Sequence, residues 1–229
     1  MKEHFSELLE NLRRQLIGMG AEAEEQIRLA VEALVEADAA RAGRVIERDH
    51  AIDQMENRNE EDAIHLFATQ QPVASDLRLL VACLKINTDL ERIGDHAVNI
   101  AESAERLARV RPFKPWIDIP HMAVIARGML KDALDAFVRR DATLALDVCK
   151  RDDLLDDKNK SIIRELLTYM AENPALISAS IEIMSVSKNL ERVGDLSTNI
   201  AEETIYVAEG ANIKHRAMEG RAAAPAREP

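Results

Sequence analysis

Acidic and amide side chains recur at steps of four residues in four places along the chain. The residues concerned are Asp49, Asp53, Glu91, Asp95, Asn99, Asp152, Asp156, Glu191, Asp195 and Asn199. A step of four advances about 40° around an α-helix and about 6 Å along it, so each set shares one helix face. Close carboxylates repel one another unless a proton or a cation neutralises them. The pattern therefore predicts a cation site in each half of the chain.

The donor types restrict which cation such a site would take. An all-oxygen set suits hard or borderline ions such as magnesium, manganese or iron, whereas zinc normally takes His or Cys ligands. His50 and His96 are optional nitrogen ligands in the first half, but Asp153 and Leu196 stand at the corresponding positions of the second. The alternative is a solvated acidic face paired with neighbouring arginines, because charge runs on helices are usually exposed to water.

Arginines and glycines lie inside the acidic pattern. Arg92 and Arg192 could bind phosphate through the guanidinium fork, but among carboxylates we expect them to be structural ion-pair partners. Gly94 and Gly194 lie within predicted helices, where glycine costs about 1 kcal/mol relative to alanine. Each glycine indicates that a neighbouring helix or a ligand approaches the backbone closely. The sequence does not decide between the two.

Proline and N-capping residues divide the chain into six long helices. Ala, Leu, Glu, Arg and Asp dominate the composition and aromatic residues make up 3% of it, which favours helix over sheet. Asp38 and Asp141 are candidate N-caps, and Pro72 and Pro174 suit the first turns of helices. With their caps, the predicted helices span about 4–37, 38–68, 71–109, 120–139, 141–172 and 173–210.

The two halves of the chain repeat each other. LERIGDHAVNIAE (90–102) and LERVGDLSTNIAE (190–202) share Leu, Glu, Arg, Gly, Asp, Asn, Ile, Ala and Glu at the same positions. This internal duplication predicts an all-α fold of two tandem, pseudo-symmetric three-helix bundles. The expected division is a first repeat at 1–110, a proline-rich linker at 111–119, a second repeat at 120–212 and a flexible tail at 213–229, to which no role is assigned.

Bulk properties exclude several classes of function. A net charge of −11 argues against nucleic acid and against direct adhesion to anionic lipid, because both need clustered Lys and Arg. The sequence has no run of about 18 apolar residues and no signal-peptide core at its N-terminus, so we expect a cytoplasmic protein. Cys83 and Cys149 lie in apolar helical stretches without ligand-like spacing, which predicts two buried free thiols.

The two repeated segments, LERIGDHAVNIAE and LERVGDLSTNIAE, resemble the signature of the PhoU family, and the resemblance extends to about residue 212. It implies a dimeric cytosolic protein that couples the phosphate-specific ABC transporter (Pst), through its ATPase, to the sensor histidine kinase PhoR. Contact with the membrane would be indirect, through these partners. Such a protein keeps phosphate-starvation genes off when phosphate is plentiful.

The resemblance also bears on the acidic residues. Family members carry an E/D-xxx-D motif that can bind multinuclear metal clusters, and its positions fall here on Asp49, Asp53, Glu91, Asp95, Asp152, Asp156, Glu191 and Asp195. The family typically has His-Ala after the second Gly-Asp, whereas this chain has Leu196-Ser197. The second cluster is therefore expected to bind metal differently or more weakly.

The leading interpretation is a regulatory adaptor that acts through protein contacts and catalyses nothing. One alternative is a ferritin-like dimetal oxidase, but such sites need Glu-x-x-His pairs on two helices, and this chain offers only Glu47 with His50. A second alternative is a purely structural helical scaffold whose acidic face keeps it in solution. Metal content separates the scaffold from the adaptor.

Overall fold

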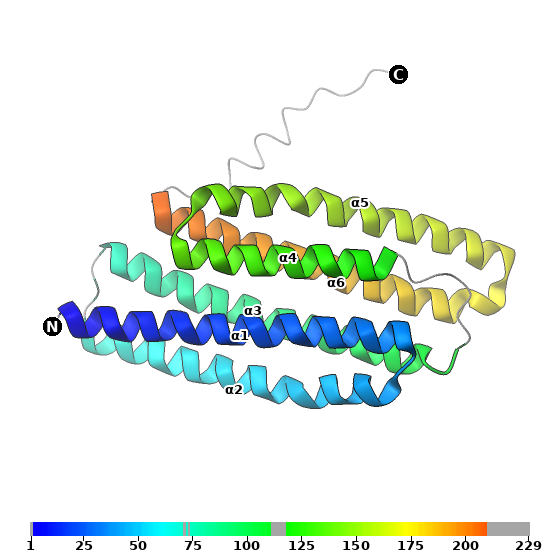
Figure 1. Cartoon of the computed structure of the whole chain (residues 1–229), viewed down its shortest axis with the longest axis horizontal. Helices are drawn as coiled ribbons and strands as arrows, with labels where there is room; N and C mark the ends of the chain where they lie inside the picture. Colours follow the sequence, from blue (N-terminus) through cyan, green and yellow to red (C-terminus); the bar gives the residue numbers. More distant parts are fainter. Residues whose placement is uncertain (1, 71, 73, 111–117, 210–229) are drawn as a thin grey trace, which may run out of the picture.

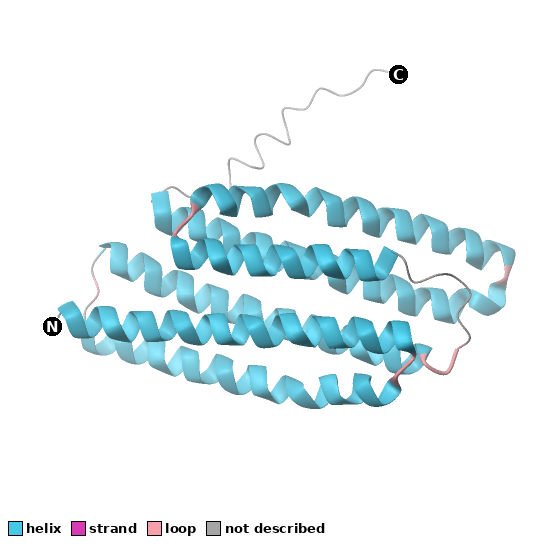
Figure 2. Ribbon diagram, in the orientation of Figure 1, coloured by secondary structure: helices cyan, strands magenta, loops and turns pink. Residues whose placement is uncertain are grey.

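Six long helices form almost all of the described chain in the computed structural model, which describes residues 2–70, 72, 74–110 and 118–209 (Figures 1 and 2). They are α1 (Lys2–Glu36), α2 (Ala39–Gln70), α3 (Ala74–Leu107), α4 (Asp118–Arg139), α5 (Ala142–Glu172) and α6 (Ile177–Glu209). A short 3-10 helix, η1 (Pro174–Leu176), precedes α6. The described residues contain no strand. The predicted all-α class with six long helices is confirmed.

The helices pack as two groups of three that lie side by side (Figure 1). Helices α1, α2 and α3 pack on one another, and so do α4, α5 and α6. The two groups join where α3 packs on α6 and α1 packs on α4. No helix in the described ranges is both long and apolar enough to cross a membrane.

The same tight turn ends the first helix of each group. Ala37 and Arg140 have positive φ values of 55° and 54°, the left-handed conformation that stops a helix. Asp38 then accepts a hydrogen bond from the backbone N–H of Arg41 at 2.9 Å. Asp141 accepts two first-turn amides, at 3.0 and 3.1 Å. Both predicted N-caps therefore satisfy amides that have no partner within the helix.

Three helix starts differ from the predictions. Helix α3 begins at Ala74, so Pro72 lies before the helix and not in its first turn. Helix α4 begins at Asp118, so the linker ends before the predicted residue 119, because Pro120 is tolerated in a first helical turn. Pro174 opens η1 rather than an α-helix, and Asn173 caps η1 by accepting the N–H of Ala175 at 3.1 Å. Gln71, most of the linker (111–117), Gly210 and the predicted tail lie outside the described residues.

The cysteines differ from each other in burial. Cys83 lies in the core of α3, and its burial raises the pKa of its thiol to about 12. Cys149 on α5 is only half-buried, although burial also raises the pKa of its thiol, to about 11. Both are free thiols. The prediction of a buried thiol is therefore right for Cys83 and too strong for Cys149.

Ion pairs fix how α3 crosses α6. Lys85 contacts Glu203 at 2.9 Å, and Arg106 contacts Glu182 at 2.9 Å. The later residue of α3, Arg106, pairs with the earlier residue of α6, Glu182, so the two helices run antiparallel. The Glu203 side chain is only 4% exposed, so its pairing with Lys85 offsets the cost of burying a charge. The two repeats therefore meet through specific contacts as well as apolar packing.

The glycines in the middle of α3 and α6 mark close contacts between helices. A β-carbon at Gly94 would lie 2.9 Å from Ile52 Cδ1 on α2. At Gly194 the equivalent atom would lie 2.5 Å from Leu155 Cδ1 on α5. Ile52 and Leu155 are completely buried. Of the two explanations that the sequence left open, the structure shows the neighbouring helix.

We predict that Gly194→Ala destabilises the fold although alanine favours helix. Overpacking against Leu155 costs about 1–3 kcal/mol, which offsets a gain of about 1 kcal/mol in helix propensity. Gly18 in α1 is the matched control, because a β-carbon there would meet nothing within 4 Å. Urea unfolding should show Gly18→Ala more stable than the wild type and Gly194→Ala less stable. Equal gains from both substitutions would contradict the close contact.

Candidate functional site

The acidic residues of α2 and α3 come together on one side of the first repeat. Asp49 Oδ1 lies 3.4 Å from the position of a β-carbon at Gly94, which places it directly against α3. The charges of Asp53 and Asp95 both raise the pKa of Asp49, after burial, so these carboxylates are close neighbours. The two pairs therefore face each other across the α2–α3 contact, as the predicted first site requires.

Glu91 is the most strongly perturbed carboxylate of this group. Burial, followed by the charges of Asp95, Glu56, Asp53 and Asp49, raises its pKa to about 7. Within the described chain, none of these five carboxylates forms an ion pair with lysine or arginine; Asp53 has only His50, at 3.6 Å. The first acidic cluster, defined as Asp49, Asp53, Glu56, Glu91 and Asp95, is therefore short of positive charge.

Glu56 is a member of the cluster that the sequence reasoning missed. Its pKa is raised by burial and by the charges of Glu60, Asp53 and Asp95. It lies three residues after Asp53, on the same helix face, and so falls outside the steps of four that define the repeated pattern. Steps of three, which also keep residues on one helix face, include it.

The second acidic cluster, Asp152, Asp156, Glu191 and Asp195, occupies the same place between α5 and α6. Asp152 Oδ1 lies 3.4 Å from the β-carbon position of Gly194, as Asp49 does from that of Gly94. Here, however, each of three carboxylates pairs with a cation. The contacts are Lys188 with Glu191 at 2.5 Å, Arg192 with Asp195 at 3.0 Å and Lys160 with Asp156 at 3.4 Å.

The difference between the clusters comes from a few substitutions between the repeats. Lys188 corresponds to Thr88 in the first repeat, and Lys160 corresponds to Asn57. Arg192 pairs within its cluster as predicted, whereas Arg92 lies 3.9 Å from Asp89, outside the first cluster. The repeats thus share the placement of their acids but not their charge balance.

The two asparagines are not joined to the carboxylates by any hydrogen bond between described residues. Asn99 is exposed on α3. Asn199 lines a hollow of about 280 Å³ between α3 and α6, together with Lys85, Asp89 and Glu203. Their place in a cation site remains a prediction.

His96, the optional nitrogen ligand, contacts the other repeat. Its Nδ1 lies 2.8 Å from Asn189 Oδ1 on α6. Burial lowers the pKa of His96, so the neutral ring is favoured. A neutral imidazole with its proton on Nδ1 donates to Asn189, which commits that nitrogen to the contact between α3 and α6.

The first cluster fits a divalent cation in charge and in donor chemistry. It offers carboxylate oxygens alone, the ligands that magnesium and manganese prefer, and their mutual repulsion is uncompensated. Within the described residues, no three Asp, Glu, His or Cys side chains form a ready-made coordination group. Asp95 is exposed and Glu91 half-buried, so both side chains have room to change rotamer. In the second cluster, two lysines and an arginine already supply positive charge that a metal ion would otherwise supply.

A ferritin-like oxidase site finds no support in the position of the Glu-x-x-His pair. Glu47 is exposed, and the side chain of His50 is 85% exposed. Dimetal carboxylate sites of that class lie inside the bundle, with ligands projecting inward from facing helices. Glu47 and His50 instead face solvent.

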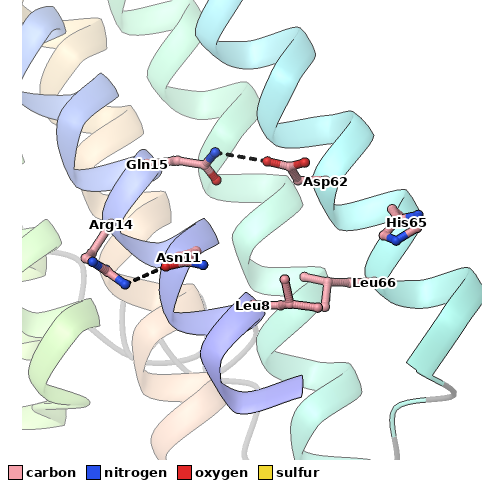
Figure 3. Close-up of a pocket in the computed structure, with 7 residues that line it drawn as sticks. All are labelled: Leu8, Asn11, Arg14, Gln15, Asp62, His65 and Leu66. Atoms are coloured by element: carbon pink, nitrogen blue, oxygen red, sulfur yellow. Dashed lines mark hydrogen bonds between the residues drawn. The ribbon is translucent and has the colours of Figure 1, made fainter. Parts of the chain in front are cut away.

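A separate hollow of about 420 Å³ lies between α1 and α2, away from the acidic clusters (Figure 3). Its walls carry Leu8, Asn11, Arg14, Gln15, Asp62, His65 and Leu66. The polar side chains bond one another: Gln15 donates to Asp62 at 2.9 Å, and Arg14 donates to Asn11. This hollow has no link to the repeated acidic pattern.

Two solved structures of proteins named PhoU have the same architecture. The crystal structure of PhoU from Pseudomonas aeruginosa matches with a TM-score of 0.87 and 41% identity, over 90% of this chain and 100% of that one. The phosphate transport system regulatory protein PhoU from Streptococcus pneumoniae matches with a TM-score of 0.86 and 28% identity, over 92% and 99%. The fold is therefore that of the PhoU class of helical proteins.

Sequence comparison identifies the family. The PhoU domain model matches residues 16–104 and 119–204. Relatives named phosphate-specific transport system accessory protein PhoU homolog are 40% identical in Pseudomonas putida, over 95% of this chain and 86% of the relative, and 42% identical in Clostridium acetobutylicum, over 91% and 96%. The chain belongs to the PhoU family, and the predicted resemblance is confirmed.

The raised pKa of Glu91 predicts how stability depends on pH. Between its ordinary value of 4.5 and about 7, the folded protein holds a proton that the unfolded chain has released. This contribution to stability is present in full below pH 4.5 and is lost as the pH rises through 7. Glu91→Gln removes the repulsion, so we expect it to be more stable than the wild type at pH 8 and similar to it at pH 5.

Glu191→Gln is the matched control, because it breaks the contact with Lys188 instead of relieving repulsion. It should be no more stable than the wild type at pH 8. Urea unfolding of the three proteins at both pH values gives the comparison. Equal losses of stability in both variants at pH 8 would show that Glu91 is also compensated.

Proposed function

We propose that this protein is a cytoplasmic negative regulator of the phosphate-starvation response. It acts as a homodimeric adaptor between the phosphate ABC transporter, through its ATPase, and the transporter's sensor histidine kinase, PhoR. Membership of the PhoU family carries this proposal, and its relatives are named transport accessory proteins rather than enzymes.

We further propose that the first acidic cluster binds a divalent or trivalent ion, manganese, magnesium or iron. Asp49, Asp53, Glu91 and Asp95, with Glu56 beside them, would hold it. The observation that supports this is the convergence of carboxylates that form no ion pair with lysine or arginine in the described chain; burial, followed by their charges, raises the pKa of Glu91 to about 7. Bound metal would supply the positive charge that Lys160 and Lys188 supply in the second repeat, and it would thereby stiffen the α2–α3 contact face.

Deletion of the gene tests the regulatory role. Without the adaptor the kinase would lose its phosphate-dependent restraint, so phosphate-scavenging genes should be expressed constitutively in medium rich in phosphate. A reporter fused to such a promoter measures this, and the wild-type gene supplied in trans should restore repression. Repression that persists in the deletion strain would refute the role.

Metal retention tests the cluster. Apo-protein loaded with Mn²⁺ or Fe²⁺ and passed through gel filtration should retain metal, as measured by mass spectrometry. Glu91→Gln with Asp95→Asn should abolish retention, because it removes two of the uncompensated charges. Glu191→Gln with Asp195→Asn should change it much less, because lysines and an arginine already neutralise that cluster. Equal losses from both pairs, or no retention by the wild type, would count against the proposal.

A further inference from the structure

Each helical hairpin carries an exposed surface that is acidic at one end and apolar at the other. On α2 the residues at steps of three and four are Asp49, Asp53, Glu56, Glu60, Ile64 and Phe67. On α3 they are Asp95, Glu91, Thr88, Leu84, Val81 and Leu77. None of these residues is buried. We call this surface the α2–α3 strip.

The helix register makes the strip continuous. Gly94 lies against Ile52, and Asn59 donates a hydrogen bond to Asn87 at 2.9 Å. In both contacts the residue numbers sum to 146, so positions on α2 and α3 with that sum are level. By the same rule Ile64 is level with residue 82, beside Val81. The apolar side chains of the two helices therefore adjoin, as the acidic ones do.

The apolar end is exposed to an extent that calls for a partner. Phe67 is 58% exposed, Ile64 57% and Val81 39%. Single exposed apolar residues are normal, but a group of adjacent ones on a regular helix face marks an interaction site. The equivalent end of the second repeat also carries exposed apolar residues, Leu167, Ile177 and Ile181. The two repeats thus present the same feature at the tips of their hairpins.

Charge decides what kind of partner fits the α2–α3 strip. Among the described residues, no carboxylate at its acidic end forms an ion pair with lysine or arginine, so a well-matched partner brings positive charge there. A second copy is a poor fit: a parallel arrangement sets carboxylates against carboxylates, and an antiparallel one sets carboxylates against Phe67 and Ile64. Anionic lipid and nucleic acid would be repelled.

We propose that the α2–α3 strip docks an amphipathic helix of a partner protein, with Lys or Arg side chains over the first acidic cluster and apolar side chains over Ile64, Phe67 and Val81. Asp49 and Phe67 lie roughly 27 Å apart along α2, at 1.5 Å per residue, so the partner helix needs about five turns. A docked helix contacts both ends of the strip at once. Its apolar side chains provide affinity, and its charged side chains fix its orientation. The inference rests on the proposed adaptor role and names the chemistry of its contact.

The second repeat is a natural comparison. Lys160 and Lys188 lie between the acidic and apolar ends of its strip and already neutralise carboxylates. A basic helix would therefore gain less electrostatic binding energy on the second repeat. The proposal therefore assigns the partner helix to the first repeat, and it predicts that metal, which would neutralise the same carboxylates, weakens docking.

A designed peptide tests the docking surface on the full-length protein. The probe is a helix of about 20 residues with Leu on one face at one end and Lys on the same face at the other, and the control peptide has Glu in place of Lys. Fluorescence anisotropy in EDTA should show binding of the Lys peptide only. Two double variants should each weaken binding of the Lys peptide roughly tenfold or more. One is Ile64→Ser with Phe67→Ser, and the other is Glu91→Gln with Asp95→Asn.

Two controls place the site. Leu167→Ser with Ile181→Ser in the second repeat, and Val124→Ser on α4, which is 64% exposed, should leave binding within about twofold of the wild type. Salt should weaken binding to the wild type more than to the Glu91→Gln, Asp95→Asn variant, because screening acts on the charged end. Equal binding of the two peptides, or equal effects of strip and control variants, would overturn the proposal.

A photocrosslinking amino acid at position 67 tests the surface in cells, with position 124 as control. The expected crosslink lies on an amphipathic helix that carries Lys or Arg some turns away, as shown by sequencing the crosslinked peptide. A crosslink to a second copy or to lipid, or a yield no greater than at position 124, would overturn the proposal. Because the repression assay does not depend on these readouts, the adaptor role can survive a failure here.

Discussion

The close contact between α2 and α3, and its repeat between α5 and α6, is the constraint on which the rest depends. Glycine at 94 and 194 leaves room for the buried side chains of Ile52 and Leu155 against the opposite backbone. The same contact brings Asp49 and Asp152 beside those glycines. The same helix contact therefore produces both the tight packing of Ile52 and Leu155 and the repulsion between the carboxylates. The packing stabilises a helix arrangement that the repulsion destabilises.

The two repeats resolve that repulsion differently. The second repeat uses Lys160, Lys188 and Arg192, so three of the four carboxylates in its cluster are paired with a cation. In the first repeat no described lysine or arginine pairs with the cluster, and burial, together with the neighbouring carboxylates, raises the pKa values of Asp49, Glu56 and Glu91. The first half therefore carries negative charge that a proton or a cation can neutralise. That asymmetry is the reason why we propose the first repeat as the place for a metal ion or a basic partner.

The arrangement also fits an adaptor physically. Ion pairs and antiparallel packing of α3 on α6 join the two repeats, so the hairpin tips with their exposed apolar residues are held at fixed positions. A surface that is acidic along one stretch and apolar along the next can distinguish partners by orientation as well as by affinity.

The sequence by itself determined the helices, their caps and the internal duplication. Asp38 and Asp141 cap as predicted because capping depends on neighbours within one turn. It also placed the paired acids, since a step of four fixes a helix face. The start of α4 was missed by two residues, because proline in a first turn is compatible with more than one start.

Only the tertiary structure decided which charges are compensated. Lys188 reaches Glu191 and Lys160 reaches Asp156 within their own helices, but the sequence does not show that the first cluster lacks such cations from every neighbouring helix. The role of Gly94, the inclusion of Glu56 and the commitment of His96 to Asn189 likewise depend on helix register. Local sequence patterns determine which side chains share a helix face, whereas packing between distant segments determines which residues those side chains contact.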